Sequence, residues 1–129
     1  MRTWLQRFTQ KKVRLSGADW EQRALLFLQQ HKLHLLVRNY RCKTGEIDLI
    51  MRAPDATLIF IEVRARTHHH FGGAAASVDK FKQQRLLHTA AHYLQRCSPI
   101  PACRFDVVAF ENGQLKWYQN AFSADQYHF

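Results

Sequence analysis

The stretch that decides the fold is Gly45–Arg66, which reads GEIDLIMRAPDATLIFIEVRAR. Two runs rich in Ile, Leu, Phe and Val flank Pro54 and Asp55, which are residue types that favour a turn. Two short apolar runs on either side of a turn indicate a β-hairpin. Because side chains alternate between the faces of a strand, the position of the turn decides which residues face each other.

With the turn centred on Asp55, the hairpin places two carboxylates opposite each other. Antiparallel pairing sets Asp48 opposite Glu62, and Glu46 opposite Arg64. Opposed Cβ atoms lie about 4.5–5.5 Å apart, and like charges there destabilise a sheet unless a positive charge lies between them. Mg²⁺ or Mn²⁺, held by one or two carboxylates, waters and substrate phosphates, meets this requirement. The alternative is that Asp48 pairs with a neighbouring arginine while Glu62 and Arg64 form a solvated edge.

A lone aspartate followed, one hairpin later, by Glu-X-Lys resembles the metal site of restriction-endonuclease-like nucleases, including archaeal Holliday junction resolvases. The matching residues here are Asp48, Glu62, Val63 and Arg64, with arginine at the position of the lysine. The resemblance implies a restriction-endonuclease-like α/β fold, in which helices flank a mixed β-sheet. It also implies a Mg²⁺ or Mn²⁺ site formed by Asp48, Glu62 and the main-chain carbonyl of Val63, with Arg64 directed at the scissile phosphate.

Four sequence blocks, taken in order, resemble the YraN-like family of bacterial proteins, which is assigned to the same nuclease superfamily. The blocks are RNYRCKTGEIDLI, FIEVRAR, FGGAAASVDKFKQQRLL and RFDVVAF. The resemblance extends from about Gly17 to Phe122 and implies metal-dependent cleavage of DNA.

A first helix is predicted from the capping box of Ser16 and Asp19 to about His31. Glu21 lies on the inward stripe of this helix, where a carboxylate needs a partner. The resemblance implies that Glu21 is a third acid of the site, since related resolvases place a glutamate on their first helix. The alternative is a glutamate favoured only by the helix macrodipole.

A second helix is predicted from an N-cap at Ser77 through Arg96. Gln83 lies in the middle of its apolar stripe, where a buried amide must find partners. The resemblance implies that Gln83 orients water or the metal, as the glutamine after the Glu-X-Lys strand does in the superfamily. The alternative is that Gln83 lies beyond the edge of the core.

The chain is strongly basic, with 19 Lys and Arg against 10 Asp and Glu and a formal net charge of +9. This charge favours a polyanionic partner, first nucleic acid and second an anionic membrane surface. A basic protein that binds neither is the alternative. The candidate nucleic-acid contacts are Arg41, Lys43, Arg66, Lys80, Lys82 and Arg85.

At 129 residues the chain is long enough for one domain and too short for two ordinary ones. Residues 1–15 are expected to form a basic N-terminal arm, and residues 16–129 a single nuclease-like domain. Further strands are predicted over Leu35–Arg41, Cys103–Phe110 and Leu115–Tyr118, so the order is αβββαββ. This order favours a mixed sheet with helices packed against it over a helix bundle or a barrel.

The sequence also bears on location. No apolar run is long enough to span a bilayer, and the first 14 residues lack the apolar stretch of a signal peptide. A cytoplasmic protein without a membrane partner is therefore expected. The run His68–His70 is interpreted as a flexible, partly protonatable loop, because three adjacent histidines cannot all face one metal from a regular element.

Three hypotheses of function follow. The first is a metal-dependent nuclease that acts on branched or duplex DNA, which it contacts mainly through phosphates. The second is a binding module on the same fold without cleavage, which arginine at position 64 favours. The third is an adaptor whose basic surface docks an acidic protein. A homodimer with two-fold symmetry would suit a four-way junction.

Overall fold

The computed structural model describes residues 15–66 and 78–124. Most of the proposed basic arm and the run His68–His70 lie outside the described residues. The elements are α2 (Gly17–Gln30), β1 (His34–Cys42), β2 (Gly45–Arg52), β3 (Leu58–Arg66), α3 (Lys80–Leu94), β4 (Cys103–Glu111) and β5 (Gln114–Phe122). The predicted α/β class and the order αβββαββ are confirmed.

The five strands form one mixed sheet in the order β1-β2-β3-β4-β5. Strands β1, β2 and β3 make an antiparallel meander, as predicted, and β4 and β5 make a second antiparallel pair. Strands β3 and β4 run parallel, and the chain between them includes α3. A parallel pair needs such a crossover connection, which explains why a helix separates the two hairpins in the sequence.

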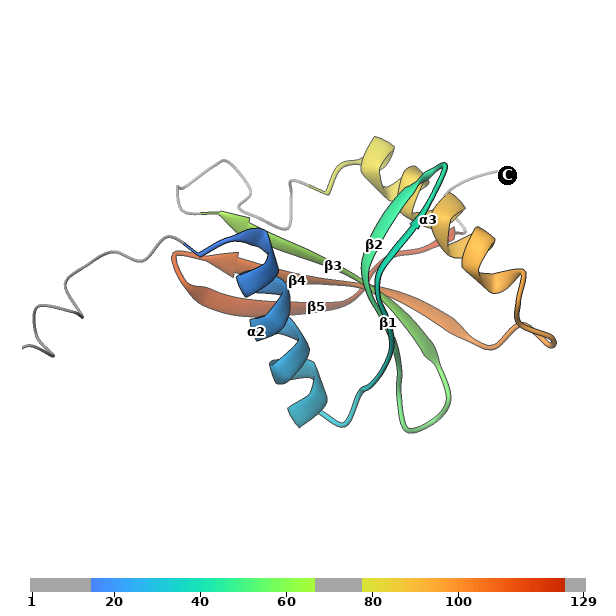
Figure 1. Cartoon of the computed structure of the whole chain (residues 1–129), viewed down its shortest axis with the longest axis horizontal. Helices are drawn as coiled ribbons and strands as arrows, with labels where there is room; N and C mark the ends of the chain where they lie inside the picture. The colour runs from blue at the N-terminus through green and yellow to red at the C-terminus, as the bar shows by residue number, and fades with distance from the viewer. Residues whose placement is uncertain (1–14, 67–77, 125–129) are drawn as a thin grey trace, which may run out of the picture.

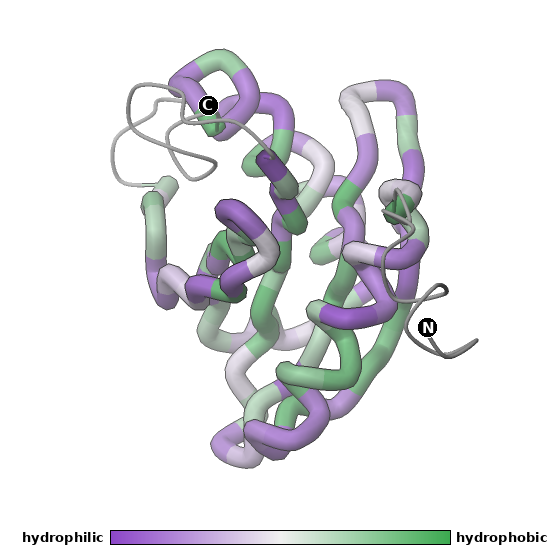
Figure 2. The backbone as a smooth tube through the Cα atoms, turned by 90° about the vertical axis from the view of Figure 1, so that its left-hand side faces the viewer, coloured by the Kyte–Doolittle hydropathy of each residue, from purple (hydrophilic) through white to green (hydrophobic). Residues whose placement is uncertain are grey.

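The two helices cover opposite faces of the sheet (Figure 1). On one face α3 buries Leu86, Leu87, Ala90 and Tyr93 against residues such as Phe60. On the other face α2 buries Ala24, Leu25 and Leu28 among Leu49, Met51, Ile59, Ile61, Val108 and Phe110. Figure 2 shows the hydrophobic residues gathered along the strands and hydrophilic residues along the outer turns.

The helix starts follow from their capping residues. Ser16 and Asp19 form the predicted capping box at the start of α2. The predicted N-cap of the second helix is wrong: α3 begins at Lys80, and Asp79 is its N-cap, with Oδ1 accepting from the backbone N–H of Lys82 at 2.8 Å. Ser77 and Asp79 are both good N-cap types, so residue type alone does not decide between them.

Neither helix could serve as a membrane span. Within residues 15–66 and 78–124, no helix is long and apolar enough to cross a bilayer. The longer helix, α3, has 15 residues and carries Lys80, Lys82 and Arg85 in its first half. A transmembrane helix needs about 20 consecutive apolar residues.

A buried carboxylate joins β4 to β5. Asp106 is 1% exposed and accepts from the side chain of Arg104 at both oxygens, each at 2.9 Å. Trp117 Nε1 and the backbone N–H of Asn120 also donate to it, each at 2.9 Å. Each oxygen of the buried carboxylate thus accepts two hydrogen bonds. Because these bonds hold β5 in place, the role of Asp106 is structural.

We expect Asp106→Ala to lower the free energy of unfolding by about 3 kcal/mol, because three donor groups lose a buried, charged acceptor. Urea unfolding followed by circular dichroism measures this loss. The control is Lys116→Ala, which breaks an exposed ion pair with Glu111 at 3.5 Å and should cost less than about 1 kcal/mol. Equal losses in the two variants would contradict the structural role of Asp106.

Candidate active site

The site forms where β2 separates from β3. Their ladder runs from Arg52↔Leu58 to Leu49↔Ile61, which is the predicted register. Beyond that pair, β2 continues only with β1, and β3 continues with β4 as far as Arg66. The β1–β2 hairpin bends toward α3 (Figure 1), and an opening lies beside β3 past the last ladder pair. Asp48 and Glu62 are the first residues past the last ladder pair.

The carboxylate of Asp48 takes the place of the missing ladder bond. Its Oδ2 accepts from the backbone N–H of Val63 at 2.8 Å. The N–H and C=O of one strand residue point to the same side, so the Val63 carbonyl also faces the opening. The predicted pairing of Glu46 with Arg64 is wrong, because the strands have separated; Glu46 Oε2 instead lies 3.1 Å from Arg41 Nε on β1.

The opening is an open cavity of about 410 Å³. It brings together three carboxylates that the sequence placed on separate elements: Glu21 of α2, Asp48 of β2 and Glu62 of β3. The remaining lining residues are Gly17, Trp20, Val63, Arg64, Ala65 and Arg66. Because the sheet is split at this point, acids from its two faces can meet in one cavity.

Glu21 is tied to the hairpin by Asn39, which the sequence did not single out. With the amide oriented to satisfy both of its ends, Asn39 Nδ2 donates to Glu21 Oε1 at 2.8 Å and to Glu46 Oε1 at 3.0 Å. Asn39 has φ +56° inside β1, a conformation that asparagine adopts more readily than most residues. Its only trace in the sequence is an asparagine within a strand pattern, where this residue type is depleted.

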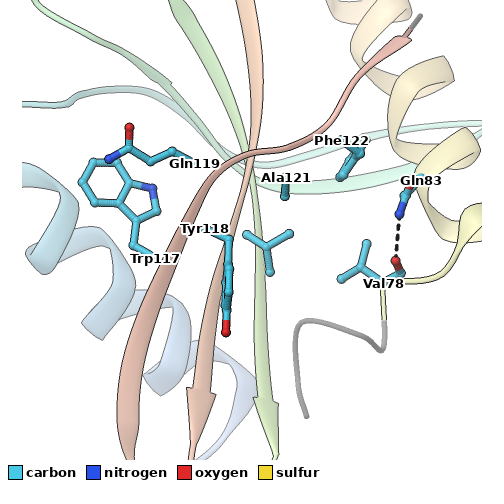
Figure 3. Close-up of a pocket in the computed structure, with 8 residues that line it drawn as sticks. Val78, Gln83, Trp117, Tyr118, Gln119, Ala121 and Phe122 are labelled. Atoms are coloured by element: carbon cyan, nitrogen blue, oxygen red, sulfur yellow. Dashed lines mark hydrogen bonds between the residues drawn. The ribbon is translucent and has the colours of Figure 1, made fainter. Parts of the chain in front are cut away.

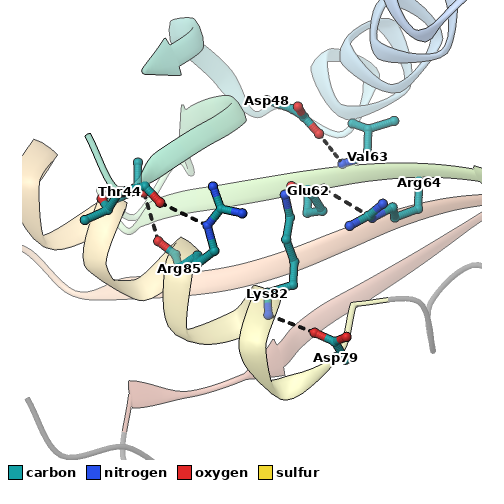
Figure 4. Close-up of polar contacts among 9 residues, drawn as sticks. Thr44, Asp48, Glu62, Val63, Arg64, Asp79, Lys82 and Arg85 are labelled. Atoms are coloured by element: carbon teal, nitrogen blue, oxygen red, sulfur yellow. Dashed lines mark hydrogen bonds and ion pairs between the residues drawn. The ribbon is translucent and has the colours of Figure 1, made fainter. Parts of the chain in front are cut away.

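Two cations converge on Glu62, whose side chain is 7% exposed (Figure 4). Arg64 Nε lies 3.2 Å and Lys82 Nζ lies 3.7 Å from Glu62 Oε1. Arg64 shares a strand face with Glu62, whereas Lys82 reaches it from α3. Arg64 Nε is buried and has no aligned hydrogen-bond partner among the described residues, so its contact with Glu62 is an ion pair only.

The clustered acids hold their protons more tightly than usual. Burial, and then the charge of Glu62, raise the pKa of Asp48 to about 7, against the opposing effect of the Val63 N–H. Burial also raises the pKa of Glu62, although Lys82 and Arg64 lower it. Burial is the main cause of the raised pKa of Glu21. Such crowding favours any cation that enters the cavity.

The sequence from residue 20 to residue 110 matches the model of the uncharacterised protein family UPF0102. The chain belongs to this family. The match spans most of the described elements, from the first turn of α2 to the end of β4, and so includes all three acids of the cavity. This match confirms the resemblance to the YraN-like family that the four sequence blocks carry.

Several UPF0102 proteins are similar over most of their length. One from Cupriavidus necator is 58% identical over 113 residues, with 88% of this chain and 86% of the relative aligned. One from Cupriavidus pinatubonensis is 60% identical over 109 residues, which are 84% of this chain and 86% of the relative. Among solved structures, the EndoMS–dsDNA2 complex has a TM-score of 0.40 and 15% identity. This chain spans 38% of that protein, and the alignment covers 76% of this chain.

In this UPF0102 protein, Gln83 is not among the residues that line the cavity of the carboxylates. It is half-buried rather than central in the apolar stripe, and its Nε2 donates to the Val78 carbonyl at 3.0 Å. It lines a second cavity of about 590 Å³ together with Trp117, Tyr118 and Phe122 (Figure 3). Its neighbour Lys82 reaches Glu62, and a role of Gln83 in orienting water or a metal stays a prediction.

The predicted nucleic-acid contacts lie at the cavity, on the β1–β2 hairpin and on α3. Arg66 lines it, and Arg85 Nε donates to the Thr44 carbonyl at 3.2 Å, which places its guanidinium at the tip of the β1–β2 hairpin. Arg41, on β1, is paired with Glu46, with its side chain 75% exposed. Lys43 and Lys80 are exposed at the hairpin turn and at the start of α3.

The donor set suits a hard cation with few protein ligands. Among residues 15–66 and 78–124, no three His, Cys, Asp or Glu side chains are grouped closely enough to form a protein cage for a metal. Mg²⁺ uses no such cage, since it keeps several waters and binds through one or two carboxylates. Asp48, Glu62 and the Val63 carbonyl meet that description, and their crowded charge supplies the attraction.

We expect the metal-free protein to lose stability as the pH rises from about 5 to about 8. The folded pKa of Asp48, about 7, lies above its unfolded value, so the folded state binds an extra proton that is lost in this range. Asp48→Asn keeps an acceptor for the Val63 N–H but cannot ionise, and should flatten this loss by on the order of 1–2 kcal/mol. Urea unfolding at both pH values measures it; identical pH profiles would contradict the raised pKa.

Proposed function

We propose that this protein is a metal-dependent nuclease that hydrolyses phosphodiester bonds in DNA, with branched DNA among its candidate substrates. The observation that carries the proposal is the cavity at the β2–β3 split, where two carboxylates and the Val63 backbone face two cations. Acidic groups can hold a cation, and basic groups can hold the phosphate beside it. A site for phosphoryl transfer needs both kinds of group within one cavity.

Mg²⁺ or Mn²⁺ would be held by the side chains of Asp48 and Glu62 and by the Val63 carbonyl. When bound, such an ion polarises the scissile phosphate and lowers the pKa of an attacking water. Glu21 supports the site from α2, since Asn39 fixes its carboxylate relative to Glu46 and the hairpin. The residues of this chain thus hold the ligands in place from both faces of the sheet.

Arg64 and Lys82 would stabilise the negative charge that develops on the phosphate. The buried Arg64 Nε makes no aligned hydrogen bond among the described residues, so a phosphate oxygen would supply the acceptor it lacks. Arg64 cannot exchange its proton, because a guanidinium remains charged. Lys82 places an ammonium at the same carboxylate, so arginine at position 64 does not leave the site without a lysine.

A non-catalytic DNA-binding module is the second candidate, and one observation favours it. Glu62 already has two cationic partners, Arg64 at 3.2 Å and Lys82 at 3.7 Å. These partners neutralise the carboxylate without a metal. In this alternative the same cations contact DNA phosphates and no bond is broken.

The metal site is tested by Asp48→Ala and Glu62→Ala. Each should remove Mn²⁺ binding in calorimetry and abolish metal-dependent nicking of branched and linear duplex DNA, because each variant removes one of the two carboxylates that would hold the ion. Asp55→Ala is the matched control, since Asp55 is an exposed aspartate at the far turn of the same hairpin. Mn²⁺ affinity that persists in both site variants would rule out this metal site. Nicking that persists in Glu62→Ala would come from a contaminant or another site.

Variants of the two cationic residues, Arg64 and Lys82, distinguish the nuclease hypothesis from the binding-module hypothesis. In the nuclease, Arg64→Lys should keep or raise cutting, while Arg64→Ala and Lys82→Ala should each lower it by roughly 100-fold, the scale of one electrostatic donor. In the binding module no variant cuts, and each alanine variant loses about one phosphate contact in salt-dependent binding. Nicking assays with a chelator control, run beside anisotropy titrations, distinguish the two. Absence of cutting by wild type and by Arg64→Lys on every substrate would exclude the nuclease.

A further inference from the structure

Two segments that meet in the fold contain no acidic residue. The first runs from Gln22 to Gly45 and the second from Lys80 to Phe105, and neither includes an Asp or a Glu. The segments meet because the tip of the β1–β2 hairpin packs on α3. Several basic and imidazole side chains of these segments lie at the hairpin tip, on α3 or just after α3. They are Arg41, Lys43, Lys80, Lys82, Arg85, His88, His92 and Arg96.

A groove lies between the hairpin tip and α3. It encloses about 390 Å³ and is lined by Lys43 and Thr44 from the hairpin and by His88, His92 and Gln95 from the helix side. Its walls are fixed relative to each other, since Thr44 Oγ1 lies 2.9 Å from Thr89 Oγ1 in a hydrogen bond. Its lining carries Lys43 and two imidazoles and no acidic residue, so its fixed walls offer a surface that an extended polyanion can follow.

Two basic side chains of α3 lie between the groove and the candidate active site: Lys82 beside Glu62 and Arg85 beside Thr44. Figure 4 shows Thr44, Arg85, Lys82 and Glu62 in succession, so Arg85 lies between the cavity and the hairpin tip. At the other end Arg96 Nη2 donates to the Tyr40 hydroxyl at 3.5 Å, and the hydroxyl also bonds His92. From Lys82 to Arg96 the row is about 20 Å long at 1.5 Å per residue, or about six base pairs of duplex.

We propose that this groove binds the nucleic-acid backbone where it leaves the cavity, with Lys43, His88 and Arg96 contacting phosphates. The inference rests on the proposed function for the identity of the polyanion. Charge complementarity supports it, since the facing segments carry no carboxylate over the length of the row. The fixed hairpin contact supports it as well, because phosphate contacts on a rigid surface set the position of the strand.

The test is binding without metal, by fluorescence anisotropy with a linear duplex and a four-way junction in chelator. Lys43→Gln should reduce the slope of log affinity against log salt by about 0.9 on duplex. His88→Glu should weaken affinity by on the order of tenfold, because it places a like charge beside a phosphate. His34→Glu is the matched control, an exposed histidine at the opposite end of β1, and should leave affinity unchanged. Thermal melting checks that each variant is folded.

The outcomes separate this inference from the nuclease proposal. Affinity that depends on Lys43 and His88 in a protein that never cuts would support the groove and reject the nuclease. Metal-dependent cutting with an affinity and salt slope unchanged in Lys43→Gln and His88→Glu would reject the groove and keep the nuclease. If the groove variants instead lost binding to a polyglutamate peptide and kept binding to DNA, its partner would be an acidic protein and the inference would be overturned.

Discussion

The separation of β2 from β3 after the Leu49–Ile61 pair is the constraint on which the site depends. The cavity is lined by Asp48 of β2 and by the residues of β3 past this pair. Once β2 has departed, the Val63 N–H needs another acceptor, since an unpaired buried amide is costly. Asp48 supplies it at 2.8 Å, so one carboxylate both closes the end of the ladder and faces the cavity.

The same separation concentrates negative charge. Besides burial, the charge of Glu46 raises the pKa values of Glu21, Asp48 and Glu62, and only part of the negative charge is balanced by neighbouring groups. Asn39 joins two of the acids, and Lys82 and Arg64 partner a third. The described ion pairs give Asp48 no such cationic contact, and its pKa is raised to about 7. The acids therefore reduce the stability of the folded protein at neutral pH and make the cavity attractive to a cation.

The architecture could be predicted from local sequence patterns, because strand alternation, turns and helix caps depend on residues close together in the sequence. Strand alternation and the turn at Asp55 predicted the correct hairpin register, and the capping box at Ser16 predicted the start of α2. Three details required tertiary structure. They are the end of the β2–β3 ladder, which separates Glu46 from Arg64, the choice of Asp79 as N-cap, and the bond of Gln83 to the Val78 carbonyl. No periodicity encodes the point at which two strands part.

Arginine stands at position 64 in place of the motif lysine, but another element of the fold brings a lysine to the same carboxylate. Residues two apart on a strand share a face, so Glu62 and Arg64 both lie on the face that α3 covers. A helix packed on that face can bring a side chain to the same carboxylate, and Lys82 does so from the first turn of α3. The two cations differ in chemistry, since a lysine can lose its proton when buried and an arginine cannot. The presence of a lysine ammonium beside Glu62 thus depends on the packing of α3, which Asp79 caps, and not on the strand motif alone.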